Sequence, residues 1–146
     1  MTTIDSRPEC DPREAWKVEP YTWVNHFELV MDGFDIRYQL KHELVKACQT
    51  SPSAEICGLI DTRMRPHFII NDHPEPLHNF KMQEASFRRT IELICAGNDG
   101  VLGCFHSHPQ GPATPSKGDL EGWPDTQLDW RYFIVTINGV FEYRKI

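Results

Sequence analysis

Two histidines separated by one residue, His106 and His108, are the part of the sequence best suited to chemistry. They follow a short apolar run, and side chains two residues apart on a strand point to the same side, so both imidazoles can reach one ion. Asp119 follows further along the chain, three positions after Ser116, and a helix that begins near Ser116 would place both on one face. Two imidazole nitrogens and a carboxylate are typical protein ligands of a catalytic zinc, whose fourth position is open for water.

A less specific interpretation is that the His-x-His pair lies on an exposed strand face and binds nothing. The surrounding sequence argues against this, because the apolar run Val101–Phe105 ends abruptly in His-Ser-His-Pro and a polar loop rich in glycine and proline follows. Such an arrangement costs stability and is typical of a functional site. The other clustered histidines have no shared face and are interpreted as solvated loop residues, namely His67, His73 and His78.

Hydrophobic periodicity predicts the elements that must position these residues. Apolar residues recur at helical spacing from Ile36 and again from Phe87, which predicts one helix up to about Thr50 and a second up to Gly97. Asn138-Gly139 predicts a hairpin between the last two strands. The expected strands are 22–30, 56–60, 66–70, 101–105, 132–137 and 140–145. The expected architecture is α/β (α+β), with a central mixed β-sheet between two helices and the zinc site at the sheet edge.

The spacing of the polar residues resembles the signature of the JAMM (MPN-plus) zinc metalloproteases. His-Ser-His-Pro at 106–109, six residues, Ser116, two residues and Asp119 match it without a gap. Glu-Ile-Cys-Gly-Leu at 55–59 is similar to the Glu-x-Cys-Gly-Leu form of bacterial and phage members, and Asn79 stands where such proteins often carry an asparagine.

The resemblance covers roughly Ile36 to Lys145. It implies a cytidine-deaminase-like JAMM fold for a metalloprotease domain of residues 35–146. Residues 1–34 would then be an N-terminal extension, of which 22–30 could form one strand.

Carried over by position, the resemblance implies that His106, His108 and Asp119 ligate Zn²⁺. It further implies that Glu55 is the general base and that Ser116 stabilises the oxyanion. A zinc ion can lower the pKa of its bound water from about 15.7 to roughly 7, and a neighbouring carboxylate can take that proton and pass it to a leaving amine. The predicted reaction is therefore hydrolysis of a peptide or isopeptide bond. Without the resemblance, Glu55 would be interpreted as a solvated residue and Ser116 as a plain helix N-cap.

Three hypotheses on function follow from the sequence. The first is a zinc metallopeptidase of phage-tail or bacterial JAMM type, because the compact chain resembles the JAMM domain of phage tail assembly proteins. The NlpC-type domain commonly joined to that domain is missing here. The second is a protease that processes or deconjugates a ubiquitin-like or sulfur-carrier protein, which requires a groove for an extended Gly-Gly tail. The third, a non-catalytic MPN scaffold, is disfavoured because all five motif residues are present.

Composition excludes several other classes of function. The chain of 146 residues has 15 Lys and Arg against 21 Asp and Glu without a basic stripe, so a nucleic-acid partner is not expected. No apolar run approaches the roughly 20 residues that a membrane helix needs, and the polar amino end is unlike a secretory signal, so we expect a cytoplasmic protein. Five cysteines without a Cys-x-x-Cys pair predict reduced thiols, and Cys48, Cys57, Cys95 and Cys104 are expected to pack as small apolar residues.

Overall fold

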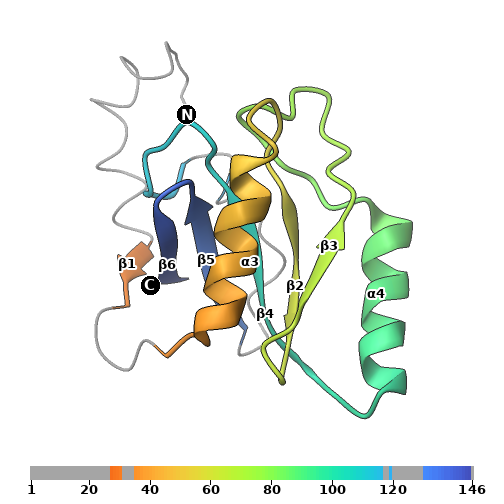
Figure 1. The fold of residues 1–146 in the computed structure, drawn as a ribbon. Helices are drawn as coiled ribbons and strands as arrows, with labels where there is room; N and C mark the ends of the chain where they lie inside the picture. Colours follow the sequence, from red (N-terminus) through yellow and green to blue (C-terminus); the bar gives the residue numbers. More distant parts are fainter. Residues whose placement is uncertain (1–26, 31–34, 117–118, 120–129, 146) are drawn as a thin grey trace.

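The computed structural model describes residues 27–30, 35–116, 119 and 130–145. Its strands form one sheet in the order β1-β6-β5-β4-β2-β3 (Figure 1). The elements are β1 (Phe27–Leu29), α3 (Tyr38–Gln49), β2 (Cys57–Asp61), β3 (Pro66–Ile69), α4 (Glu84–Ala96), β4 (Val101–Ser107), β5 (Arg131–Thr136) and β6 (Gly139–Lys145). The β4–β5 pair is parallel and the other pairs are antiparallel, so the sheet is mixed, as predicted.

Helices α3 and α4 cover opposite faces of the sheet, each over its own apolar cluster. Leu40 and Leu44 of α3 pack with Phe105 of β4, and α3 lies in front of the sheet in Figure 1. Ile94 of α4 packs in the other cluster with Cys104 of β4. Because side chains alternate along a strand, the residue after Phe105 returns to the α4 face. The architecture confirms the expected α/β (α+β) fold. Strand β4 lies between β5 and β2 in the strand order, so its end has neighbouring strands on both sides.

Several predicted boundaries shift by a few residues. Strand β4 continues through His106 and Ser107, because the backbone of Ser107 still bonds to Ile56 and pairs with β5. Of the predicted strand 22–30, β1 is the described part, and residues 22–26 lie outside the described residues. The predicted helix from Ser116 to about 122 also lies largely outside them. None of the helices in the described ranges is long and apolar enough to cross a membrane.

The cysteine prediction is correct for three positions and wrong for one. Cys48, Cys57 and Cys104 are buried and form no disulfide, whereas Cys95 is exposed. The reason is helical geometry, since Cys95 directly follows Ile94, a buried residue of α4, and one residue turns the side chain by about 100° around the helix axis. Cys10 lies outside the described residues.

Gly58 is required by close packing between β2, β3 and β4. A Cβ atom at this position would lie 2.1 Å from the carbonyl oxygen of His67 and 2.7 Å from the ring of Phe105. Real Cβ contacts are longer than this, so any other residue would push the strands apart. The glycine of the Glu-x-Cys-Gly-Leu motif therefore has a structural explanation.

Asp61 organises the far end of the sheet, where β2 meets the start of β4. Its buried carboxylate accepts hydrogen bonds from the backbone N–H groups of Arg63 and Arg65, at 2.9 and 3.0 Å. It also contacts Nε of Arg65 at 2.8 Å and Nε2 of His67 at 2.9 Å. Burial alone would raise the pKa of Asp61, but the bonds from His67 and Arg65 outweigh burial and lower it to about 2.

Replacing Asp61 by asparagine is expected to lower the free energy of unfolding by about 2 kcal/mol at pH 7. Because the folded pKa is depressed, this contribution is complete above the ordinary value of 3.8 and disappears as the pH falls through about 2. Urea denaturation of both proteins at several pH values measures the difference. Asp72→Asn, at an exposed position, is the control, and a difference that persists undiminished at the lowest pH would contradict the argument.

Candidate metal centre

Four buried side chains meet at the end of β4, namely Glu55, His106, His108 and Asp119. They come from three separate segments of the chain, and one ligand atom of each lies within 4.8 Å of those of the others. The structure therefore brings together the three predicted metal ligands and the predicted base. Ser116, the fifth predicted site residue, lies beside this group and contacts Asp119.

The two histidines are held by the sheet on one side and by ring contacts on the other. His106 pairs with Cys57 and Ile134 inside the sheet, and its ring stacks on Phe80 with 4.2 Å between centroids. The backbone N–H of His108, directly after the strand, donates to the carbonyl of Val135 at 2.8 Å. The Nε2 atoms of the two histidines are 3.2 Å apart. The predicted same-side orientation is therefore confirmed.

The second ring nitrogen of His108 determines which nitrogen faces the centre. Its Nδ1 lies 2.7 Å from the carbonyl oxygen of Pro112. A carbonyl oxygen only accepts hydrogen bonds, so Nδ1 carries the proton in this contact. In its neutral form, the ring therefore directs the lone pair of Nε2 toward the centre, which is the arrangement found in metal-ligating histidines.

Asp119 bridges the two histidines. Its Oδ1 lies 2.8 Å from Nε2 of His106, and its Oδ2 lies 3.0 Å from Nε2 of His108. The backbone N–H of Ser116 donates to Oδ2 of Asp119 at 2.8 Å, and the N–H of Asp119 donates to Oγ of Ser116 at 3.2 Å. This reciprocal pair of hydrogen bonds has the form of a capping box, which is the contact expected of Ser116 as a helix N-cap.

Glu55 precedes β2 and lies outside the sheet, and its backbone is held by hydrogen bonds to a neighbouring loop. Its N–H donates to the carbonyl of Pro76 at 2.7 Å, and its carbonyl accepts from Nδ2 of Asn71 at 3.0 Å. Its side-chain oxygen Oε1 is buried and has no hydrogen-bond partner among the described residues. Leaving a polar atom buried without a partner costs free energy, and such an atom in a native protein is explained by a proton, a water or an ion.

The pKa values of the two carboxyl groups in this cluster are shifted in opposite directions. Burial would raise the pKa of Asp119, but His106 and His108 outweigh it and hold that pKa well below its usual range. Burial raises the pKa of Glu55 well above its usual range, with Asp119 adding to the effect and His108 opposing it. Two carboxyl groups whose pKa values are pushed apart are typical of an acid-base site. Here Asp119 is the permanent anion and Glu55 the group able to carry a proton.

The histidines respond in opposite directions to the same surroundings. Burial disfavours the charged form of His108, but the Asp119 carboxylate outweighs burial and raises its pKa to about 9. Burial dominates at His106 and lowers its pKa despite Asp119. A cation is therefore already favoured at this place, because without a metal ion a proton on His108 balances Asp119.

Sequence reasoning missed the residues that hold the centre from outside. Phe80 and Asn71 carry no local signal of this role, since each acts on a residue far away in sequence. Ser107, between the two histidines, accepts a hydrogen bond through Oγ from the N–H of Ile56 at 2.8 Å and so ties the histidine pair to the residue after Glu55. In the described part of the chain, His67, His73 and His78 join no second group of potential ligands.

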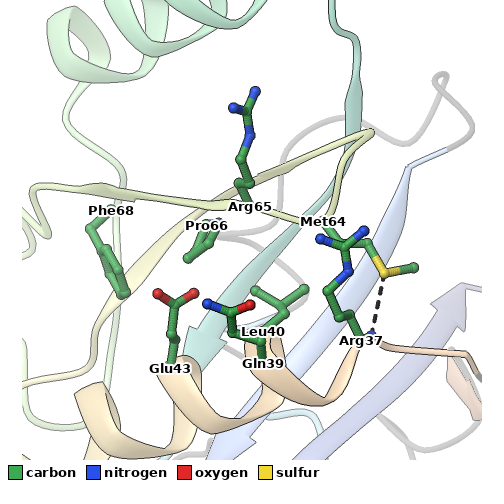
Figure 2. A pocket seen from close by; sticks show the side chains of 8 residues that line it. All are labelled: Arg37, Gln39, Leu40, Glu43, Met64, Arg65, Pro66 and Phe68. Carbon is green, nitrogen blue, oxygen red and sulfur yellow. Dashed lines mark hydrogen bonds between the residues drawn. The ribbon is translucent and has the colours of Figure 1, made fainter.

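A groove on the α3 face lies apart from the four residues. It runs between α3 and the β2–β3 hairpin, where Glu43 of α3 faces Phe68 of β3 (Figure 2). At one end the backbone N–H of Arg37 contacts the sulfur of Met64 at 3.3 Å. The residues that line it are Arg37, Gln39, Leu40, Glu43, Met64, Arg65, Pro66 and Phe68. None of these residues belongs to the group of four potential metal ligands, so this groove is not part of the centre.

Three curated relatives are similar to part of this sequence. The desampylase of Haloferax volcanii is 31% identical over 81 residues, covering 50% of this chain and 58% of that protein. The desampylase of Pyrococcus furiosus is 30% identical over 99 residues, covering 65% of this chain and 67% of that protein. A probable TtuB-protein conjugate cleaving protease of Thermus thermophilus is 31% identical over 72 residues, covering 48% of this chain and 45% of that protein. The chain thus spans about half to two thirds of the length of these relatives.

The fold is shared with a solved structure. The solution structure of a Desulfitobacterium hafniense protein superposes with a TM-score of 0.61 at 25% sequence identity, covering 72% of this chain and 78% of that chain. Residues 38–144 match the family described as prokaryotic homologs of the JAB domain (Prok-JAB). The resemblance to the JAMM-type proteins, a metal-dependent family, is confirmed, whereas these relatives lend no support to the phage-tail subtype. The match over most of the chain shows that this protein belongs to the Prok-JAB family.

Proposed function

We propose that this protein is a zinc-dependent hydrolase of JAMM type that cleaves a peptide or isopeptide bond. The observation that carries the proposal is the convergence of Glu55, His106, His108 and Asp119 in one buried group. A non-catalytic scaffold would not need an unpartnered carboxylate oxygen beside two histidines, since burying it destabilises the fold.

The donor set fits zinc. The Nε2 atoms of His106 and His108 and the carboxylate of Asp119 would hold the ion, and two imidazoles with one carboxylate form a three-ligand set of the kind catalytic zinc sites use. When bound, zinc would lower the pKa of a water molecule and polarise the carbonyl of the scissile bond.

Glu55 supplies the proton transfer in this proposal. Its carboxylate accepts a proton from the attacking water and then donates it to the nitrogen of the leaving amine. In the metal-free protein, burial already raises the pKa of Glu55 above its ordinary value of 4.5. Burial limits competing proton exchange with bulk solvent.

Ser116 stabilises the oxyanion in the same proposal. Its Oγ already accepts a hydrogen bond from the N–H of Asp119, so the hydroxyl proton remains available for donation. A donor directed at the oxygen of the scissile carbonyl stabilises the charge that develops during attack. The hydroxyl therefore serves as an N-cap and as a donor at the same time.

The relatives favour a protein conjugate as the substrate. Two of them are desampylases and the third is a probable conjugate cleaving protease. This supports deconjugation or processing of a ubiquitin-like or sulfur-carrier protein. It favours that activity over cleavage of a phage tail component, the other protein substrate that the sequence suggests.

The test uses a Gly-Gly-ended ubiquitin-like protein joined by an isopeptide bond to the lysine of a fluorescent peptide. Cleavage is expected to stop when 1,10-phenanthroline removes the metal and to return with about one equivalent of Zn²⁺ per chain. The same peptide in linear fusion compares peptide with isopeptide cleavage. Failure of the zinc-loaded protein to cut either substrate, or full activity in the chelator, would contradict the proposal.

A further inference from the structure

We propose that Asn71 is a positioning residue, whose side-chain amide fixes the backbone of Glu55 and thereby the place of its carboxylate. The inference rests on the proposed function, in which Glu55 transfers the proton. Asn71 directly follows Ile70 and opens the loop that leads to α4.

Glu55 needs such support because one oxygen of its carboxylate makes no hydrogen bond to the described residues. The carboxylate oxygen Oε1 has no hydrogen-bond partner among the described residues, and the residue lies outside the strand ladder. Two backbone contacts hold the residue, one from its N–H to the carbonyl of Pro76 and one from Nδ2 of Asn71 to its carbonyl. Both partners belong to the loop that begins at Asn71.

The amide of Asn71 uses its full hydrogen-bonding capacity. Its Nδ2 donates to the carbonyl oxygens of Glu55 and Asn79, each at 3.0 Å. Its Oδ1 accepts from the N–H groups of His73 at 3.1 Å and Lys81 at 3.0 Å. The orientation of the amide is fixed, because carbonyls only accept and N–H groups only donate, so a flipped amide would lose all these bonds.

These bonds close the loop on itself. Asn71 joins the start of the loop to Asn79 and Lys81 at its end, and the N–H of Asp72 donates to the carbonyl of Lys81 at 2.9 Å. Pro76, which holds the N–H of Glu55, lies inside the closed segment. Both backbone contacts of Glu55 therefore depend on the asparagine side chain, one directly and one through the loop.

The neighbouring residue is held independently, which makes the effect local. Ile56 exchanges hydrogen bonds with Ser107, from its N–H to Oγ at 2.8 Å and from the N–H of Ser107 to its carbonyl at 2.9 Å. Loss of the Asn71 amide should release Glu55 while Ile56 and the strand pairing stay in place. A misplacement of about 1 Å near the chemistry can cost on the order of 10²-fold in rate.

The experiment compares Asn71→Asp with the wild-type protein, both loaded with zinc. The aspartate keeps the size and one acceptor oxygen but replaces the two N–H donors by an oxygen that faces two carbonyls. We expect kcat on the isopeptide substrate to fall by about 10²-fold with KM and zinc content unchanged. Amide hydrogen exchange by NMR should be faster at Glu55 and unchanged at Ser107. Asn71→Ser, which is smaller and retains one donor, is expected to give a weaker effect and serves if the aspartate variant does not fold.

Gln49→Glu is the matched control, because Nε2 of Gln49 also donates to a backbone carbonyl, that of Ile137, at an exposed position outside the group of four residues. It should leave kcat and the exchange at Glu55 unchanged. Unaltered exchange at Glu55 in both Asn71 variants would overturn the inference, as would a rise in KM or a loss of zinc in place of the fall in kcat. If the wild-type protein cleaves neither substrate while Glu55 exchanges faster in the variants, the proposed function fails and the positioning by Asn71 stands.

Discussion

Replacing Glu55 by glutamine is expected to lower kcat by about 10²- to 10⁴-fold while zinc content stays at the wild-type level. Glutamine has nearly the same volume but cannot take a proton from water, so only the proton transfer is removed. His106, His108 and Asp119 remain in place to hold the metal. Steady-state cleavage of the isopeptide substrate and elemental analysis of the same samples measure the two quantities.

A second, independent prediction for the same variant concerns the pH dependence of the free energy of unfolding in the metal-free protein. Since burial raises the pKa of Glu55, folding favours its protonated form, and the wild-type protein loses stability as the pH rises above the ordinary value of 4.5 toward the folded value. Glu55→Gln does not titrate, so its stability relative to the metal-free wild type should increase over that range. Turnover equal to wild type would show that Glu55 is not the proton carrier.

Replacing His108 by alanine is expected to reduce bound zinc from about one ion per chain to a trace after dialysis. In the proposed ligand set the imidazole supplies one of three protein donors, and its Nε2 lies 3.2 Å from that of His106 and 3.0 Å from Oδ2 of Asp119. The loss of affinity should exceed the roughly 10- to 100-fold effect of removing an outer-sphere partner. Elemental analysis after dialysis against a weak chelator measures it.

His42→Ala provides the control for this experiment, because His42 is an exposed histidine of α3 that stacks on Tyr38. It should bind zinc like the wild-type protein and cleave the substrate at the same rate. If His108→Ala retains stoichiometric zinc, the ion is bound elsewhere and the assigned ligand set is wrong.

Local pattern was sufficient for most of the fold. The periodicity from Ile36 predicted α3, and the apolar run Val101–Phe105 predicted the strand β4, which is buried on both faces. Asn138-Gly139 predicted the hairpin between β5 and β6. These predictions succeed because helix and strand periods are set by backbone geometry within a few residues.

The same distinction between local and long-range contacts applies to the candidate site. The spacing of His106, His108 and Asp119 pointed to a metal site on its own, since a strand period and a loop within one short segment bring them together. Glu55 was identified through a family resemblance, because nothing in its local sequence distinguishes it from a solvated residue.

Tertiary structure alone decided how Glu55 joins the histidines. The antiparallel pairing of β2 with β4 brings it to their side, and the amide of Asn71 and the hydroxyl of Ser107 hold that segment in place. These contacts join parts of the chain that are distant in sequence, and they depend on strand order and burial. Residue types and their spacing along the chain determined which groups could do the chemistry, whereas the packing of the sheet determined their mutual distances and the shifted pKa of Glu55.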